Sequence, residues 1–173
     1  MPEDKDSGMT QKEKNNRQDT IIDDVQSGKR KLEDSQEKGN FGEMKVDQDM
    51  RNKGYERISN DSVTSLDSPI HQGIDGVYYN PDGHPPYVIV DAKYGSSELK
   101  DTNDGRQMSQ NWIDNRLDSS VGKEKADDIR MEKLVDPDNV GSYVGHVDEK
   151  GNVSYDRLDD NANVVEKGAR LNA

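Results

Sequence analysis

The chain has 173 residues, of which 35% are charged and 28% hydrophobic, and its formal net charge at pH 7 is −12. This length suits one domain with a tail, and the low apolar content excludes a large core. No apolar run is long enough to cross a membrane, no signal-peptide pattern stands at the start, and the absence of cysteine excludes disulfides and thiolate metal sites. We therefore expect no membrane span.

Residues 1–40 are predicted to form a linker that is poorly structured or helical. They contain only four Leu, Ile, Val or Phe residues, and the remainder is rich in Gln, Asn, Lys and Glu of mixed charge. Folding is therefore expected to begin near Phe41, with the domain proper over 41–173. We expect this connector to join the domain to a longer chain.

The next segments alternate between helical and extended patterns. Apolar residues from Phe41 onward are spaced like one face of a helix that ends at about Gly54, and 55–59 is a short strand candidate before a loop. Segments 73–80 and 86–95 are predicted to pair as a hairpin across the turn sequence NPDGHPP. The second segment carries the uninterrupted run VIV, which is typical of a central strand in a mixed sheet.

Two helices and a second hairpin are predicted to complete the domain. Segment 105–121 places Met108 and Trp112 on one apolar stripe, for which core packing is favoured over base stacking. Segment 123–135 is predicted as another amphipathic helix, and 141–159 as a hairpin. The predicted fold is α/β, a small mixed β-sheet flanked by helices, with a C-terminal β-hairpin.

Three charged residues lie within the two most strand-like segments. If 73–80 and 86–95 pair, Asp75 and Asp91 lie at the same end of the sheet, and Lys93 leaves the strand on the face of Asp91. Two neighbouring carboxylates repel unless a cation lies between them, and Mg²⁺ prefers such hard oxygen ligands. The plain alternative is a surface ion pair between Asp91 and Lys93, with Asp75 as a turn residue.

This arrangement resembles the PD-(D/E)XK, or restriction-endonuclease-like, nuclease superfamily, whose reduced signature is Asp, a spacer, then Asp/Glu-x-Lys. The runs GIDGVY, YVIVDAKYGSSEL and DTNDGRQMSQNWIDNRL are similar to nuclease toxin domains at the C-termini of bacterial polymorphic toxins, including the LXG and contact-dependent inhibition types. The resemblance spans roughly 39–117 and implies a restriction-endonuclease-like core.

The resemblance also implies roles for five residues. Glu43, Asp75 and Asp91 would hold Mg²⁺, with Mn²⁺ as the alternative, while Lys93 would assist the attacking water and Gln107 would support the site. Relatives often carry Glu where this chain has Asp91. The three histidines are scattered along the chain, and a histidine-based site is not favoured.

The activity that the resemblance implies is an Mg²⁺-dependent endonuclease toxin used in competition between bacteria. DNA is the expected substrate, transfer RNA is the alternative, and a cognate immunity protein is the expected partner. The protein would be cytoplasmic before secretion and active in the target-cell cytoplasm. The acidic charge argues against nucleic-acid binding unless basic residues cluster locally, and the candidates are Lys93, Lys100, Arg106, Arg116, Lys123 and Lys125. A non-enzymatic acidic binding module is the rival interpretation.

Overall fold

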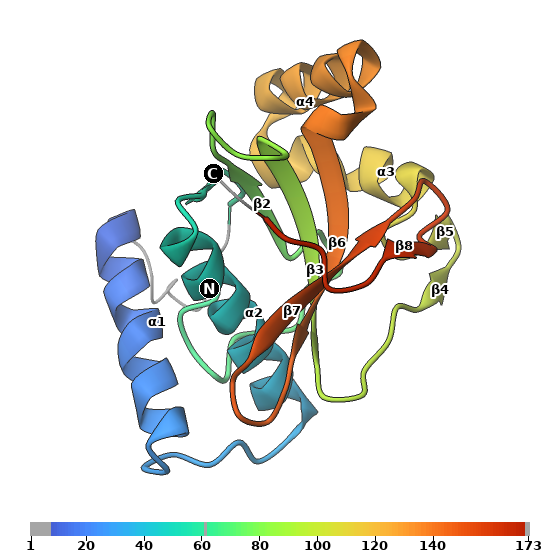
Figure 1. Cartoon of the computed structure of the whole chain (residues 1–173). Helices are drawn as coiled ribbons and strands as arrows, with labels where there is room; N and C mark the ends of the chain where they lie inside the picture. Colours follow the sequence, from blue (N-terminus) through green and yellow to red (C-terminus); the bar gives the residue numbers. More distant parts are fainter. Residues whose placement is uncertain (1–7, 61, 172–173) are drawn as a thin grey trace.

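The computed structural model describes residues 8–60 and 62–171 as a mixed α/β fold (Figure 1). Within these residues the α-helices are α1 (Gln11–Gln26), α2 (Ser35–Asn52), α3 (Gln110–Val121) and α4 (Lys123–Val135), with a 3₁₀ turn at Pro137–Asn139. The strands of the main sheet are β1 (Glu56–Arg57), β2 (Gly76–Tyr79), β3 (Tyr87–Tyr94), β6 (Val140–Val147), β7 (Val153–Leu158) and β8 (Val164–Glu166). A separate small hairpin consists of β4 (Asp101–Thr102) and β5 (Gly105–Arg106).

The main sheet is mixed, with the strand order β1-β2-β3-β6-β7-β8. The β3 and β6 strands are parallel, and every other neighbouring pair is antiparallel. The two hairpins predicted from the sequence, β2–β3 and β6–β7, are both present. The prediction that the VIV run forms a central strand is also confirmed, because β3 has a neighbour on each side.

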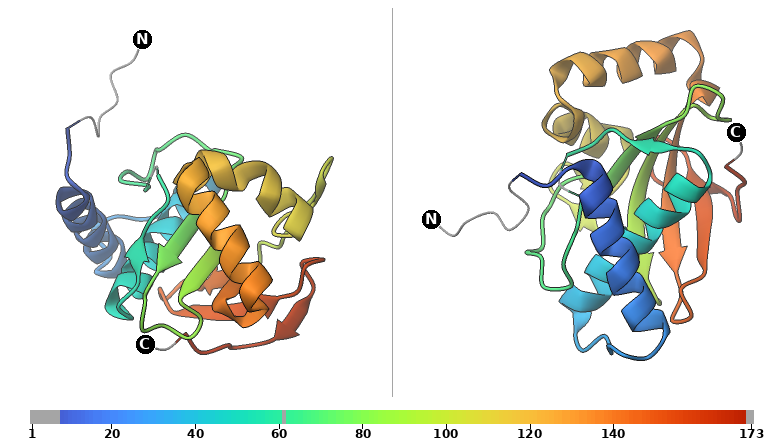
Figure 2. Two further views of the ribbon diagram at one scale, coloured as in Figure 1. Left: turned by 90° about the horizontal axis from the view of Figure 1, so that it is seen from above. Right: turned by 90° about the vertical axis from the view of Figure 1, so that its left-hand side faces the viewer.

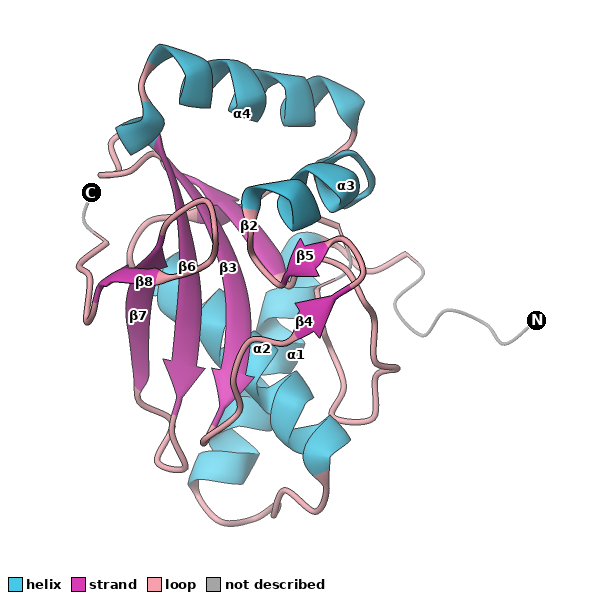
Figure 3. Cartoon of the chain, turned by 90° about the vertical axis from the view of Figure 1, so that its right-hand side faces the viewer, coloured by secondary structure: helices cyan, strands magenta, loops and turns pink. Residues whose placement is uncertain are grey.

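Helices cover both faces of the sheet (Figures 2 and 3). Val88 and Val90 of β3 point into a core shared with α1 and α2, whereas Ile89 points into a second core shared with α3 and α4. This alternation follows from the two-residue period of a strand. Trp112 and Met108 are buried in the second core, as predicted.

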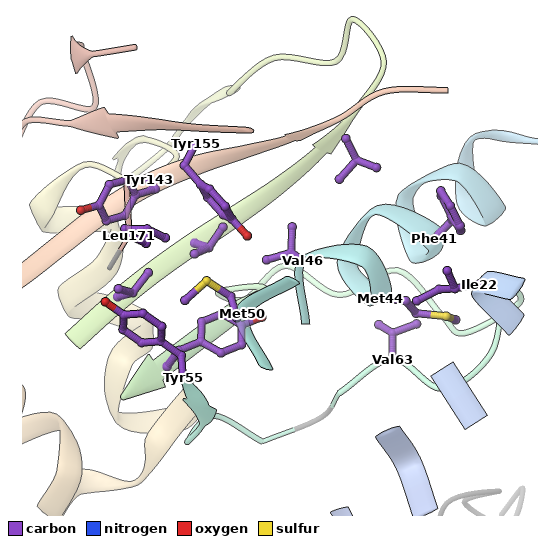
Figure 4. Close-up of a cluster of buried hydrophobic side chains, with 14 of the residues drawn as sticks. Ile22, Phe41, Met44, Val46, Met50, Tyr55, Val63, Tyr143, Tyr155 and Leu171 are labelled. Carbon is purple, nitrogen blue, oxygen red and sulfur yellow. The ribbon is translucent and has the colours of Figure 1, made fainter. Parts of the chain in front are cut away.

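The N-terminal boundary predicted at Phe41 is wrong, because folded structure begins well before it. Residues 11–26 form α1, which carries a capping box at Thr10, and Ile22 is fully buried against Phe41 and Met44 (Figure 4). Helix α2 starts at Ser35, so the predicted boundary falls inside it. The prediction from composition failed because α1 needs few apolar residues. Ile22 is buried, Ile21 and Val25 pack partly buried against the same core, and polar contacts join α1 to α2.

Smaller differences from the predictions lie near the chain's turns and ends. Helix α3 begins at residue 110 rather than near 105, because residues 101–106 form the β4–β5 hairpin. Strand β8 was not predicted. In α4, Met131 and Leu134 are 61% and 81% exposed, so the expected apolar stripe is buried only at Ala126 and Ile129. Among the described helices, none is long and apolar enough to cross a membrane.

Candidate functional site

The candidate site forms where β3 continues beyond the end of its neighbour β2. The last pair between these strands is Gly76 with Val90, while β3 runs on to Tyr94. The backbone N–H of Ala92 therefore has no strand partner on this side, and Asp75 Oδ2 accepts its hydrogen bond at 2.8 Å. This contact places the Asp75 carboxyl beside β3, opposite Asp91, as the hairpin register predicts.

Asp75 and Asp91 are two buried acids whose pKa values are both raised. Burial raises the pKa of Asp75 to about 7, with a further rise from the Glu43 charge. Burial also raises the pKa of Asp91 well above its ordinary value, and the Asp75 charge adds to this shift. Without a bound cation, the pair is costly to ionise fully.

Lys93 lies on the same face of β3 as Asp91, two residues further along. Its Nζ is 3.1 Å from Asp91 Oδ2 and donates a hydrogen bond to Gln107 Oε1 at 3.2 Å. Gln107 Oε1 also accepts from the backbone N–H of Lys100 at 2.9 Å, and this contact closes the loop after β3. Gln107 therefore fixes the position of the ammonium group, because it joins Lys93 to a loop that β4 and β5 stabilise.

Glu43 approaches Asp75 from α2, and His71 lies against both. His71 Nε2 is 3.0 Å from Glu43 Oε1 and 3.7 Å from Asp75 Oδ1. The hydrogen bond to Glu43 raises the pKa of His71 to about 9, while burial opposes the shift. Ligand atoms of Glu43, His71 and Asp75 all lie within 4.8 Å of one another. His71 was not predicted, and its position in a loop of turn residues carries no local signal for a site.

A polar stripe on α2 holds the loop that carries His71. Gln36 Nε2 donates to the backbone O of Ser68 at 2.9 Å, and Asn40 Nδ2 donates to the same oxygen at 2.9 Å and to that of Leu66 at 2.7 Å. Residues 36, 40, 43 and 47 share one helix face because they are spaced at three or four residues. The stripe therefore aligns the loop with Glu43.

Asp75 is also held through its backbone by a buried arginine. Arg57 is only 7% exposed, and its guanidinium donates to the backbone O of Asp75 at 3.0 Å and to Asp47 Oδ1 at 2.7 Å. Asp47 in turn accepts from Tyr78 Oη and, at 2.8 Å, from Gln18 Nε2. Burial alone would lower the pKa of Arg57, but the charges of Asp47 and Tyr78 and the hydrogen bond to Asp47 together outweigh it. The network ties α1, α2 and β2 to the base of the site.

All five residues predicted for the site, Glu43, Asp75, Asp91, Lys93 and Gln107, line one cleft of about 370 Å³. The N-terminal half of α2, the loop before β2, the end of β3 and the loop after it form its walls. Of the predicted basic cluster, only Lys93 and Lys100 line the cleft. Arg106, Arg116, Lys123 and Lys125 are not among its lining residues. Lys38 of α2 is a basic lining residue that was not predicted.

The donor set of the cleft fits a divalent cation. Asp91 Oδ2 is buried, and among the described residues it forms an ion pair with Lys93 at 3.1 Å but accepts no hydrogen bond. A buried carboxylate oxygen without a hydrogen bond is costly. Carboxylate oxygens are also the ligands that hard cations such as Mg²⁺ prefer. Glu43, Asp75 and Asp91 could hold such an ion, and Lys93 lies beside it.

Comparisons with known proteins add no relative to this picture. No family model matches the chain, and neither a curated protein nor a solved structure matches it.

Proposed function

We propose that the protein is a metal-dependent nuclease of restriction-endonuclease-like fold that hydrolyses phosphodiester bonds. The observation that carries this proposal is the convergence of Asp75, Asp91 and Lys93 at one end of a hairpin, with Asp91 Oδ2 left without a hydrogen bond. Two acids can hold a divalent ion that activates water, and an ammonium beside them can stabilise the charge that develops on a phosphate. A purely structural ion pair needs only Asp91 and Lys93. It would not explain why the carboxyl of Asp75 is placed beside them, where its ionisation is costly.

The cleft residues divide the chemical work among them. A divalent ion, when bound, would lower the pKa of water and neutralise charge on the scissile phosphate. Glu43, Asp75 and Asp91 would hold it. Lys93 orients the attacking water and stabilises the negative charge that grows on phosphate oxygens as the new bond to phosphorus forms and the ester bond breaks. Gln107 keeps the Lys93 ammonium directed toward this point.

Substrate binding on this acidic protein would depend on a few local charges. Lys38, Lys93 and Lys100 line the cleft, and α2 directs its N-terminal turns toward it. A helix N-terminus favours phosphate. Affinity should be modest and sensitive to salt, because so few basic groups contribute. We prefer DNA as substrate, since cleavage of chromosomal DNA would be lethal to a competitor, and RNA is the alternative.

The proposed biological role of the nuclease is that of a toxin. The resemblance of the AKYG and GRQMS segments to polymorphic toxin domains suggests secretion from a producing bacterium and action in the target cytoplasm. A producer would need an immunity protein that covers the cleft. Co-expression with the neighbouring gene product should give a stable complex and relieve toxicity, and a product that does neither would rule out this partner.

Purified protein incubated separately with plasmid DNA and total RNA, with Mg²⁺, with Mn²⁺ and with EDTA, tests the activity. Asp75→Ala and Lys93→Ala should lose cleavage, whereas Asp156→Asn should keep it. Asp156 is a suitable control, because it is an equally exposed carboxyl that pairs with a histidine outside the cleft. The nucleic acid that is degraded identifies the substrate class.

The rival function is a non-enzymatic acidic binding module. It is favoured by the net charge of −12, which repels nucleic acid. On this view the cleft binds a cation or a basic partner and performs no chemistry. Intact DNA and RNA with every divalent metal, from protein that demonstrably binds the metal, would support the rival and refute the nuclease.

A further inference from the structure

We propose that His71 is a nitrogen ligand of the cation in the cleft, so that the site prefers Mn²⁺ or Zn²⁺ to Mg²⁺. The inference rests on the proposed metal site and goes beyond it, because the carboxylates alone predict a hard-cation site. It is carried by the position of the His71 ring between Glu43 and Asp75, together with the buried Oδ2 of Asp91 in the same cleft, which accepts no hydrogen bond and lies 3.1 Å from Lys93 Nζ.

The distances around His71 are those of a site that can close on an ion. Its Nε2 lies 3.0 Å from Glu43 Oε1 and 3.7 Å from Asp75 Oδ1. Ligands about 2.1 Å from a metal lie roughly 3.0–3.5 Å apart from one another, because bond angles in such sites are near 90–110°. Small movements would therefore place all three groups around one ion.

Side chains of α2 hold the loop that carries His71 more firmly than its turn-rich sequence suggests. The two amide side chains on α2, Gln36 and Asn40, anchor the carbonyl groups of residues 66–68. Glu43 lies on the same helix face, so the histidine and its carboxylate neighbour are positioned by one rigid element. An ordinary surface histidine would not need three buried or half-buried polar contacts just before it.

The ring of His71 has a defined orientation in the ion-free protein. Its Nδ1 faces the backbone N–H of Gly73 at 3.3 Å, and its Nε2 faces Glu43 Oε1 at 3.0 Å. Ligation through Nε2 requires that nitrogen to be free of its proton, with the remaining ring proton on Nδ1. The Gly73 contact therefore has to open as the ion binds. A contact of this length is weak, and its loss is small beside a metal–imidazole bond.

A nitrogen ligand changes which metal the site selects. Imidazole suits Zn²⁺ best of the three ions, Mn²⁺ less, and Mg²⁺ least, because Mg²⁺ keeps water and oxygen ligands. With His71 present, the site offers a nitrogen and up to three carboxylates, a mixed set. Without it, the site offers oxygen ligands alone. The preference between metals, and not simply the affinity, therefore reports the role of His71.

The test compares His71→Gln with His146→Gln. His146 is a matched control, because its Nε2 lies 3.0 Å from a carboxyl oxygen of Asp156 and its exposure, 39%, is close to the 37% of His71. Binding of Mg²⁺, Mn²⁺ and Zn²⁺ is measured by calorimetry without nucleic acid, and circular dichroism confirms folding. Pulsed electron paramagnetic resonance of bound Mn²⁺ detects a directly coordinated nitrogen in the unmodified protein.

We expect nitrogen coupling to Mn²⁺ in the wild-type protein and in His146→Gln, but not in His71→Gln. The affinity for Zn²⁺ and Mn²⁺ should fall about 10-fold or more in His71→Gln, while that for Mg²⁺ changes far less. Absence of nitrogen coupling in the wild-type protein, an equal loss for all three metals, or no metal binding at all would overturn the inference. The wild-type spectrum decides the matter even if His71→Gln does not fold.

Failure of this inference can be told apart from failure of the nuclease proposal. If nitrogen coupling is seen but no nucleic acid is cleaved, the metal site with His71 stands and the nuclease proposal is refuted. If the wild-type protein shows no nitrogen coupling and His71→Gln still cleaves nucleic acid with Mg²⁺, the nuclease proposal stands and His71 is not a metal ligand.

Discussion

Replacement of Asp75 by Asn should stabilise the ion-free protein at alkaline pH while it disables the site. Asn retains the side-chain oxygen that accepts the Ala92 N–H, and it removes the charge that burial and Glu43 oppose. The variant should therefore fold as the wild-type protein does. An active-site group that lowers stability is a recognised trade-off between stability and function.

The magnitude follows from the raised pKa. Asp75 has a pKa of about 7 in the folded protein against an ordinary value of 3.8, and each tenfold difference in proton affinity is worth about 1.4 kcal/mol. Ionised Asp75 thus lowers the free energy of unfolding by at most about 4 kcal/mol. Loss of its attraction to His71 reduces the gain from Asn, so we expect about 2–4 kcal/mol.

The sign of the pH dependence is fixed by the direction of the shift. A folded-state pKa above the unfolded value contributes stability that is complete below about pH 4 and is lost as the pH rises through about 7. The advantage of Asp75→Asn should therefore be absent at acidic pH, grow between pH 4 and 7, and stay constant above that window. Urea unfolding in EDTA at about pH 4.5 and pH 8 measures it.

The control for this experiment is Asp156→Asn, at a carboxyl of equal exposure that accepts hydrogen bonds from His146 and from the Gly168 backbone. This variant should be no more stable than the wild-type protein. Addition of Mg²⁺ or Mn²⁺ should raise the melting temperature of the wild-type protein and hardly affect Asp75→Asn, since ligand binding to the native state stabilises it. If Asp75→Asn is less stable than wild type at pH 8, or gains equally at both pH values, the reasoning is refuted.

Three further predictions concern chemistry, positioning and the N-terminal helix. Lys93→Met should reduce cleavage by about 100-fold or more. It should not weaken metal binding, because the change removes a positive charge next to the ion. A loss of metal affinity in calorimetry would contradict this role. Arg57→Lys should weaken metal binding more than Arg51→Lys, since lysine cannot hold the Asp75 carbonyl and Asp47 together. Arg51 is the matched control because it pairs with Asp19 of α1, away from the cleft. Equal effects in the same titration would mean that Arg57 only stabilises the fold. Ile22→Ala should lower the free energy of unfolding by about 2–4 kcal/mol, and a change below about 0.5 kcal/mol in urea unfolding would show that α1 is a dispensable connector.

Several local features of this protein could be predicted from short stretches of its sequence. The turn NPDGHPP between two β-branched segments predicted the β2–β3 hairpin, and that register alone implied that Asp75 and Asp91 lie opposite each other. The two-residue spacing of Asp91 and Lys93 implied a shared face. These inferences succeeded because they depend only on the period of a strand and on antiparallel pairing, which act over a few residues.

Other features were decided by contacts between segments distant in sequence. His71 reaches Glu43 and Asp75 because Gln36 and Asn40, more than twenty residues earlier, hold its loop. Helix α1 belongs to the fold although its composition resembles that of a linker, since one buried isoleucine and a polar network attach it to α2. The apolar residues near the end of α4 remain exposed, since neither core extends that far. Pattern and spacing describe what a segment can form, but which polar groups meet depends on tertiary packing, because hydrogen bonds and charge pairs join residues that the sequence keeps apart.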